Sequence, residues 1–556
     1  MKNFSSGELS KEQKALQDGN YRNRHAAGVE YDYLVIGTGN AALTCASLLS
    51  NQGYKICMLE AHDVPGGYAH TFERNGYYFC AQVHYIWGCG EGGRVYEFLK
   101  RLGLEKDITF ELFDKSGYDH MIMPDAKRVK IPYGWAELQK NIEEAYPQTT
   151  GLDAFFTIVK ALRKEMAALP RKIHWWDYLL KGLFYYPTLL RYKNATVQDV
   201  FDACGVSIEA QTILTAQAGD LLLPPDKLSL LFFVGVLGGY GSGAYSPTKH
   251  FKYYMQRLAK FVSDHGGDLY FEEYVSEIST NNGRISGVTT ASGKTFTARN
   301  YICGLDPQKS AELIGWQHFP KHYQDKLKYE YSDNGVMVYL GLKPGFDPAK
   351  YGLGNHNTWH CLDWGMNTMW EASKKLDVEH AWFFMSTPTM HGNDSGIVAP
   401  VNVIPGNVTP GNVTPEGGHI LELATFAPYA PFKQAADRDH KDYLDLKKGI
   451  AEKLIDLVVK YHIPDLKDHI AVNVVGSPIT SENFCNSPQG NAYGAALLPK
   501  YAVSRLKADT PFPNLYWCNA TSGIPGIYGT VTTGMELYMD LTGDYFYEQA
   551  AAPDEE

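Results

Sequence analysis

Residues 31–67 read YDYLVIGTGNAALTCASLLSNQGYKICMLEAHDVPGG, and this stretch decides the fold class. The apolar run Tyr33–Ile36 is typical of a buried strand in a parallel sheet, and a glycine-rich turn follows it directly. We expect a helix from about Asn40, and the apolar run Lys55–Leu59 predicts the next strand. This order of strand, turn, helix and strand predicts an α/β protein built around a Rossmann unit.

The turn itself has the pattern Gly37-x-Gly39-x-x-Ala42, which is typical of a dinucleotide-binding loop. Gly37 permits the tight turn, and Gly39 has no side chain to keep the backbone away from a pyrophosphate. Ala42 lets the helix pack closely on the strand, while the helix N-terminus offers free N–H groups to phosphates. Glu60, after the second strand, is placed to accept both ribose hydroxyls and disfavours a 2′-phosphate.

A second glycine turn follows at Pro65-Gly66-Gly67. A plain NAD domain has no need of a second glycine turn beside the pyrophosphate. The two turns together therefore favour FAD over NAD as the bound dinucleotide.

Several further segments carry a resemblance to a known family. They are ERNGYYF at 73–79, HYIW at 84–87, HGGDLYFEEYVSEISTNNGRISGVTTASGKTFTARNYICGLDP from 265, GSPITSENFCNSPQGNAYG at 476–494 and PNLYWCNATSGIPGIYGTVTTGMEL from 513. From about residue 30 to 545 the chain resembles the carotenoid desaturase and isomerase group of FAD proteins, nearest the retinol saturase and carotenoid isomerase branch. The resemblance implies a glutathione-reductase-like FAD-binding Rossmann fold with an intertwined substrate domain. It also implies FAD held without a covalent bond and a long apolar polyene or lipid substrate.

The chain is accordingly expected to be divided between two intertwined domains and two short tails. The discontinuous FAD-binding domain is expected to comprise residues 29–105, 246–305 and 476–545. The substrate domain, which faces the membrane, is expected to comprise residues 106–245 and 306–475. A polar N-terminal extension (1–28) and an acidic tail (546–556) complete the chain.

The resemblance adds four residues to the expected cofactor site. In the family, the strand at Val275 passes under the adenine; a β-meander without ligand contact is the alternative. The turn at Gly526 and Ile527 is expected to lead into a helix near Thr530 whose N–H groups face the flavin, or else to be a plain helix cap. Asn519 stands where relatives usually have Asp, and it can both accept and donate a hydrogen bond toward the flavin.

The aromatic segments supply a candidate catalytic residue and the side chains expected to line an apolar tunnel. By resemblance His84 passes near the flavin ring, where it could move a proton to or from a polyene carbon; a neutral core histidine is the alternative. The aromatic residues expected to line a tunnel are Tyr85, Trp87, Trp364, Phe383, Phe384 and Tyr429. The glycine-rich run Gly238–Gly243 is expected to be a loop beside the cavity, with a second nucleotide loop as the alternative.

Residues 173–192, IHWWDYLLKGLFYYPTLLRY, combine aromatic and apolar residues with basic flanks. This composition suits a segment that dips into a bilayer surface, although a buried helix pair explains the same residues. No secretion or import signal and no apolar stretch long enough to span a bilayer is apparent, so a cytoplasmic, peripherally membrane-bound protein is expected.

Charge and cysteine usage exclude other classes of protein. A net charge of −11 and the lack of a basic face exclude nucleic-acid binding. Nine cysteines without CxxC or metal-type pairing indicate buried free thiols in a reducing compartment, among them Cys45, Cys57 and Cys303, and predict no metal site.

Together these features predict an FAD-dependent oxidoreductase or isomerase that acts on the C=C bonds of a polyene, isoprenoid or lipid. Desaturation, saturation and cis-trans isomerisation all remain open, as does the electron donor or acceptor. The alternative is a flavin-free lipid-binding protein with the fold of the Rab GDP-dissociation inhibitors. An amine-oxidase-like enzyme is disfavoured because no polar amine-binding motif is apparent.

Overall fold

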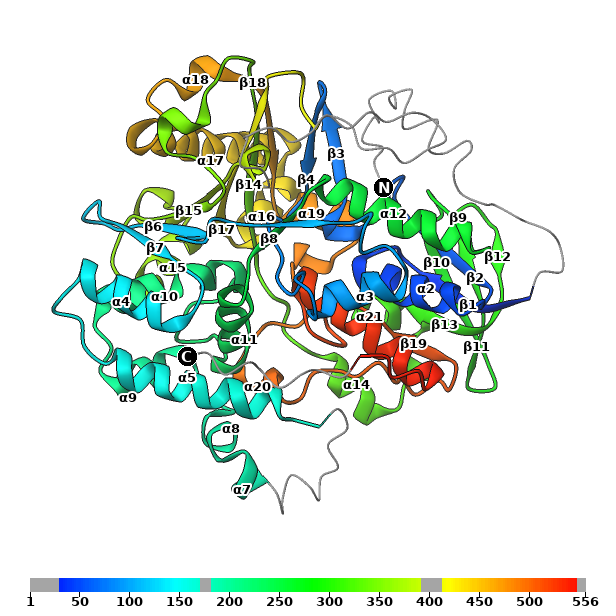
Figure 1. Cartoon of the computed structure of the whole chain (residues 1–556). Helices are drawn as coiled ribbons and strands as arrows, with labels where there is room; N and C mark the ends of the chain where they lie inside the picture. The colour runs from blue at the N-terminus through cyan, green and yellow to red at the C-terminus, as the bar shows by residue number, and fades with distance from the viewer. Residues whose placement is uncertain (1–29, 171–181, 392–412, 548–556) are drawn as a thin grey trace.

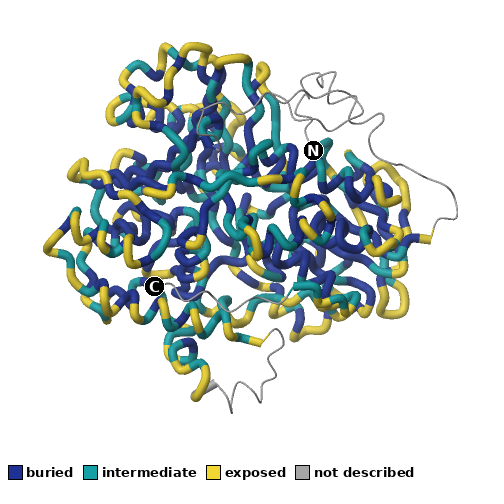
Figure 2. The backbone as a smooth tube through the Cα atoms, in the orientation of Figure 1, coloured by how far each residue is buried: buried dark blue, intermediate teal, exposed yellow. Residues whose placement is uncertain are grey.

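The computed structural model describes residues 30–170, 182–391 and 413–547. Within these ranges the chain forms two large sheets, which lie on opposite sides of the molecule, with helices between and around them (Figure 1). The expected N-terminal extension lies outside the described residues, as does the acidic tail apart from its first two residues. Exposed segments are found mainly at the periphery, whereas buried segments fill the region between the sheets (Figure 2).

The first sheet has five parallel strands in the order β19-β13-β1-β2-β9. The strands are β1 (Tyr31–Ile36), β2 (Ile56–Leu59), β9 (Asp268–Tyr270), β13 (Ala298–Cys303) and β19 (Leu515–Trp517). They come from three distant parts of the chain, and β1 lies in the middle. The α/β fold with a Rossmann unit is confirmed, and α2 (Asn40–Asn51) begins where the sequence predicts.

Both faces of this sheet are covered, which is why β2 and the last four residues of β1 are apolar. Val35 packs toward α2, α12 (His250–Asp264) and α21 (Gly526–Thr542). Leu34 and Ile36 alternate with it and pack on the opposite face, toward the hairpin formed by β10 and β11.

This hairpin turns at Asn282-Gly283, a dipeptide that favours a two-residue β-turn. Strands β10 (Val275–Asn281) and β11 (Arg284–Thr290) pair antiparallel on either side of it, with β12 (Thr295–Phe296) alongside. Asn282 and Gly283 have φ angles of 50° and 72°, as a two-residue hairpin of this type requires. The preceding run, which includes Leu269, belongs to the parallel sheet through β9 and not to this hairpin.

The second sheet has seven strands in the order β18-β14-β17-β16-β15-β6-β7. The strands are β6 (Asp119–Ile122), β7 (Arg128–Ile131), β14 (Asn334–Leu342), β15 (Asn357–Cys361), β16 (Trp382–Ser386), β17 (His419–Ala427) and β18 (Ile470–Gly476). One hydrophobic cluster packs one face of this sheet against α16 (Tyr429–Arg438) and α17 (His440–Tyr461). A larger cluster packs its other side against the helices of residues 135–241.

The remaining elements connect and cover these sheets. The short strands are β3 (Thr71–Arg74), β4 (Tyr77–Cys80), β5 (Phe110–Leu112) and β8 (Tyr245–Pro247). The helices of the first half are α3 (Arg94–Arg101), α4 (Trp135–Ala145), α5 (Leu152–Ala167), α7 (Gly182–Tyr185), α8 (Pro187–Tyr192), α9 (Val197–Cys204), α10 (Ile208–Thr215), the 3-10 helix η2 (Ala216–Leu221) and α11 (Leu230–Gly241). Those of the second half are α13 (Pro307–Ile314), α14 (Lys321–Leu327), α15 (Met366–Lys374), α18 (Leu466–His469), α19 (Pro478–Cys485) and α20 (Pro499–Ala502).

The glycine-rich run is the clearest difference from the sequence prediction. Gly238 to Gly241 form the last turn of α11, and only Ser242 and Gly243 leave the helix. A Cβ on Gly239 would lie 2.6 Å from the Trp87 ring, so the glycine allows the helix to pack against that ring. Close packing against Trp87 therefore favours a helix at these residues, and the prediction of a loop is wrong.

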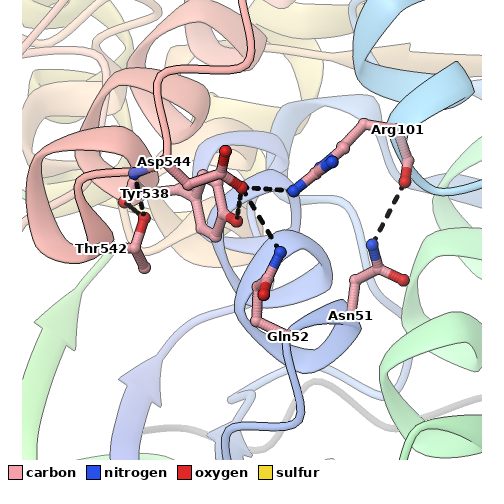
Figure 3. A network of polar contacts seen from close by, with 6 residues as sticks. All are labelled: Asn51, Gln52, Arg101, Tyr538, Thr542 and Asp544. Carbon is pink, nitrogen blue, oxygen red and sulfur yellow. Dashed lines mark hydrogen bonds and ion pairs between the residues drawn. The ribbon is translucent and has the colours of Figure 1, made fainter.

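A polar network joins the C-terminal ends of α2, α3 and α21, which are helices beside the first sheet (Figure 3). The Asp544 carboxylate pairs with Arg101 of α3 and accepts a hydrogen bond from the Tyr538 hydroxyl at 2.6 Å. Gln52, at the end of α2, donates to the same carboxylate at 3.4 Å. The ends of α2, α3 and α21 are thereby joined at one point.

The interfacial segment predicted at 173–192 is described only from residue 182. There α7 and α8 project from the body of the molecule (Figure 1), and Phe184 and Tyr185 are 84 % and 66 % exposed. No helix among the described residues is both long enough and apolar enough to cross a bilayer.

Candidate functional site

One cavity of about 320 Å³ collects almost all of the predicted site residues. Those that line it are Gly37, Gly39, Glu60, Gly66, Gly67, His84, Val275, Asn519, Gly526 and Ile527. Ala42 is the exception, because it is buried behind the first turn. The site is therefore assembled from residues that are far apart in the sequence.

The two glycine turns meet at the floor of this cavity. Gly37 has a φ of +90°, a conformation that suits glycine, and Gly39 precedes the first residue of α2. The Gly66 N–H donates to the Thr38 carbonyl at 3.1 Å, and a Cβ on Gly67 would lie 3.2 Å from the Gly39 Cα. A Cβ on Gly39 would meet no atom within 4 Å, so the backbone at this turn faces open space.

Ala42 contributes through packing. It is 1 % exposed, and its Cβ would lie 3.4 Å from a Cβ placed on Gly304. The Gly304 N–H in turn donates to the Ile36 carbonyl at 2.8 Å. A small residue at 42 thus allows α2 to approach the ends of β1 and β13.

Glu60 is held at the edge of the cavity by backbone N–H groups. Its Oε2 accepts from the Thr38 N–H at 2.7 Å and from the Thr38 hydroxyl, and its Oε1 accepts from the His62 N–H at 2.9 Å. Each carboxylate oxygen can accept more than one hydrogen bond. The carboxylate is therefore oriented by the protein and keeps capacity for a ligand.

Val275 lines the cavity, and the residues just before it contact Glu60. The Glu273 N–H donates to the Glu60 carbonyl at 2.8 Å, and Glu273 also lines the cavity. Val275 follows at the start of β10 and is 6 % exposed. The hairpin segment thus lies against the end of β2.

The side chain of Asn519 forms hydrogen bonds with other residues of the protein. Its Oδ1 accepts from the N–H groups of Thr521 and Ser522 at 3.0 Å each, and its Nδ2 donates to the Leu305 carbonyl at 2.9 Å. The side chain therefore holds the turn after β19 in place.

The helix at the terminal motif begins earlier than predicted. The α21 helix starts at Gly526 and not near Thr530, directly after Pro525. The Asn40 Nδ2 donates to the Ile527 carbonyl at 3.0 Å and to the Thr530 hydroxyl at 2.8 Å. The N-termini of α2 and α21 are thereby tied together beside the cavity.

Asn40 was not singled out from the sequence, although its position next to the glycine turn is a signal. Its Oδ1 is buried and has no hydrogen-bond partner among the described residues. Because a buried polar atom is normally paired, this oxygen points to a donor supplied by a ligand.

His84 contacts a carboxylate that the sequence analysis missed. Its Nδ1 lies 2.8 Å from Oε2 of Glu422 in β17, and the two side chains are 9 % and 1 % exposed. The ring also packs against Phe384, with centroids 4.9 Å apart. An acid within the apolar run of β17 was the available signal for Glu422. An imidazole that donates from Nδ1 to a carboxylate keeps Nε2 as its acceptor.

The aromatic wall is only partly as predicted. Tyr85 and Trp87 line the cavity; Tyr85 stacks on Tyr240 with centroids 4.0 Å apart, and Trp87 stacks on Tyr528 at 4.8 Å. The predicted residues that do not line it are Trp364, Phe383, Phe384 and Tyr429. Phe383 lies in the core beneath α17, because alternate residues of β16 point to opposite faces of the sheet.

The predicted core thiols are confirmed. Cys45, Cys57 and Cys303 are fully buried, and all nine cysteines are free. Among the described residues, no group of three or more His, Cys, Asp or Glu side chains could hold a metal ion.

Comparison with known proteins agrees with this geometry. Residues 35–102 match the NAD(P)-binding Rossmann-like domain family. The chain is 24 % identical to the chloroplastic prolycopene isomerase of Daucus carota, over 89 % of this chain and 77 % of that protein. It is 22 % identical to the all-trans-retinol 13,14-reductase of Danio rerio, over 90 % of this chain and 84 % of that protein.

Solved structures share the fold at low sequence identity. An oxidoreductase from Methanosarcina mazei superposes with a TM-score of 0.59 at 12 % identity, covering 91 % of this chain and 99 % of that chain. A putrescine oxidase bound to putrescine gives a TM-score of 0.60 at 14 % identity, covering 93 % and 99 %. The resemblance predicted from the sequence motifs is thus confirmed over about nine tenths of the chain, which is similar to the carotenoid isomerase and retinol saturase branch of the FAD-dependent desaturase and isomerase family.

Proposed function

We propose that this protein is an FAD-dependent oxidoreductase or isomerase that acts on C=C bonds of a long apolar polyene, isoprenoid or lipid. One observation carries the proposal: a single cavity joins the two glycine turns and Glu60 to His84 and an aromatic wall. The names of its relatives, prolycopene isomerase and all-trans-retinol 13,14-reductase, refer to polyenes whose double bonds are changed.

The residues present fit FAD. The open space at Gly39 and two helix N-termini beside the cavity suit a pyrophosphate, and the unpaired acceptor Oδ1 of Asn40 suits a hydroxyl or N–H donor of the flavin part of FAD. We propose that Glu60 accepts the ribose hydroxyls and that Val275 passes beside the adenine. Gly37, Gly66 and Gly67 would then face the pyrophosphate, and Gly526 and Ile527 the flavin ring. Ala42 and Asn519 act indirectly, by holding α2 and the 519–522 turn in position.

We propose His84 as a catalytic residue. When bound, FAD supplies hydride or electron transfer at the double bond. Glu422 fixes the orientation of the His84 ring, and Nε2 is the atom at which a proton is held or released. The aromatic side chains around it exclude water from an apolar substrate.

The domain division predicted from the sequence and the cytoplasmic location remain part of this proposal. So does contact with a membrane surface through residues 173–192, where the substrate would be taken up. The exposed Phe184 and Tyr185, on a helix that projects from the body, support that contact.

Absorption spectroscopy tests the proposal first. The purified protein should carry the absorbance of oxidised flavin, or gain it on incubation with FAD, while Gly39→Val should not. The reduced protein, mixed with a cis or unsaturated polyene in detergent, should then yield an isomerised or saturated product on chromatography. Colourless protein that FAD does not reconstitute would favour the flavin-free lipid-binding alternative.

A further inference from the structure

Two buried carboxyl groups share one tyrosine hydroxyl beside the cavity, and the proposed mechanism uses neither. Asp220 lies in η2 and lines the cavity. The Tyr85 hydroxyl lies 2.7 Å from Oδ2 of Asp220 and 3.3 Å from Oδ2 of Asp119 in β6. A single hydroxyl hydrogen cannot serve both carboxylates fully, so the two acids compete for it.

The two acids differ in their other hydrogen bonds. Asp119 also accepts from Gln217 Nε2 at 2.9 Å and from Asn357 Nδ2 at 3.2 Å. Among the described residues, the carboxylate of Asp220 has only the Tyr85 hydroxyl as a side-chain donor. Within the described ranges, no Lys or Arg forms an ion pair with either acid. Burying an unpaired carboxylate is costly unless it is hydrogen-bonded, so Asp119 is the better holder of the negative charge.

The pKa values follow this asymmetry. Burial raises the pKa of Asp119 to about 6 in spite of its hydrogen bonds from Gln217 and Asn357. Burial, with the negative charge of Asp119, raises the pKa of Asp220 to about 7, although Tyr85 and His84 act in the opposite direction. Near neutral pH Asp220 is therefore the group that can hold a proton and release it.

The other titratable groups facing Asp220 are His84 and four phenols, which belong to Tyr85, Tyr118, Tyr240 and Tyr493. Burial raises the pKa of every one of these phenols, so they stay protonated. The Tyr493 hydroxyl donates to the Asp220 carbonyl, which fixes the backbone of this residue beside the cavity.

We propose that Asp220 is a second catalytic acid and base of this site, in addition to His84, and that Tyr85 and Asp119 position it. This inference rests on the proposed function. In saturation, neutral Asp220 gives its proton to one carbon of the double bond, and the other carbon takes a hydride from two-electron-reduced flavin. The π bond breaks, two C–H bonds form, Asp220 becomes a carboxylate and the flavin is oxidised. Solvent then returns the proton to Asp220.

Isomerisation requires no net oxidant. Protonation of one carbon by Asp220 breaks the π bond, rotation follows, and loss of a proton back to Asp220 restores the double bond. Each acid–base group of this kind contributes typically about 10²–10⁴-fold to the rate.

A first test needs neither flavin nor substrate. Infrared difference spectra recorded across a pH titration follow the C=O stretch of a protonated carboxylic acid. Wild type should show a band that disappears near pH 7 and is absent from Asp220→Asn. Asp226 is exposed in the adjacent loop. The variant Asp226→Asn is therefore the matched control and should keep the band. A band that still disappears near pH 7 in Asp220→Asn would overturn the proposal, whereas a band that disappears near pH 6 is expected from Asp119 in both proteins.

A second test uses the flavin-loaded enzyme in single turnovers with the reduced protein and a polyene. Asp220→Asn should keep the flavin absorbance, lose about 10²-fold or more in rate, and lose the rate's dependence on pH near 7. Tyr85→Phe should shift that dependence and slow the reaction less. His84→Gln should keep a dependence on pH, because it leaves Asp220 in place, but should shift it upward, because His84 lowers the pKa of Asp220.

The outcomes separate the two proposals. A wild-type rate and pH profile in Asp220→Asn would overturn the role of Asp220 and leave the proposed function standing. Wild-type protein that binds flavin but converts no polyene, or that binds no flavin, would overturn the proposed function itself and with it this role.

Discussion

Nδ1 of His84 lies 2.8 Å from Oε2 of Glu422, although 338 residues separate them in the chain. The contact joins the segment after β4 to the centre of the seven-stranded sheet. It therefore links His84, which lines the cavity, to a buried carboxylate of the second sheet, whereas the floor of that cavity belongs to the first. The other Glu422 oxygen is buried and has no hydrogen-bond partner among the described residues.

Glu422→Gln should slow the reaction and leave the flavin absorbance unchanged. The amide keeps the volume of the side chain but removes the charge that orients His84, and a broken buried pair is costly. We expect a drop in kcat of about 10-fold or more, since general acid–base catalysis contributes about 10²–10⁴-fold. Stopped-flow flavin oxidation measures it. Glu416→Gln, an exposed acid just before β17, is the control. Equal rates in the two variants would show that His84 does not depend on Glu422.

Glu60→Ala should weaken FAD binding. Loss of one or two charge-assisted hydrogen bonds costs roughly 1.5–3 kcal/mol each, which is about 10-fold to 150-fold in Kd per bond. Flavin released into the filtrate on dilution and ultrafiltration measures the effect. Glu277→Ala, an exposed acid of β10, should retain FAD. Retention of FAD by Glu60→Ala would refute the ribose assignment.

Gly39→Val should abolish FAD binding while the protein remains folded. Gly39 has a φ of −59°, which other residues adopt, and a Cβ there meets no protein atom within 4 Å. The added side chain therefore occupies only the space proposed for the pyrophosphate. Circular dichroism and flavin absorbance measure the two properties.

Gly534 offers the opposite behaviour and serves as the comparison. A Cβ there would lie 2.4 Å from the Ala41 carbonyl oxygen, so Gly534→Val should unfold the protein by separating α21 from α2. If Gly39→Val binds FAD tightly, the proposed turn is not the pyrophosphate site.

Asp544→Ala should lower thermal stability without changing the flavin spectrum. The carboxylate joins Arg101, Tyr538 and Gln52, and partly exposed polar contacts of this kind are worth about 1 kcal/mol in total after solvent screening (Figure 3). Differential scanning calorimetry should show a small drop in Tm that shrinks at high salt. A Tm that is unchanged at low salt would mean that the network does not stabilise the helix ends.

Phe184→Ser with Tyr185→Ser should move the protein from the liposome pellet to the supernatant. These exposed side chains would add burial energy of roughly 25 cal/mol per Å² at a bilayer surface. Sedimentation with anionic vesicles measures binding, and Leu444→Ser, an exposed apolar residue of α17, is the control. Wild-type protein that stays in the supernatant would mean that its substrate arrives by another route.

The sequence by itself determined the local units of this protein. Period and glycine placement suffice for β1, the first turn, α2 and β2, because a strand buried on both faces must be apolar and a tight turn at positive φ selects glycine. The Asn282-Gly283 hairpin follows for the same local reason. Glu60 and Gly66-Gly67 lie close enough in sequence to the first turn to be assigned with it.

The tertiary structure decided everything that depends on packing between distant segments. Gly238 to Gly241 are helical because the Trp87 ring and the surrounding core stabilise a turn that glycine disfavours on its own. Asn40 contacts Ile527, and Glu422 contacts His84, across hundreds of residues. Asp220 meets Tyr85 in the same way. Local periodicity reports only which face of an element is buried, so it carries no information on which distant side chain will lie opposite.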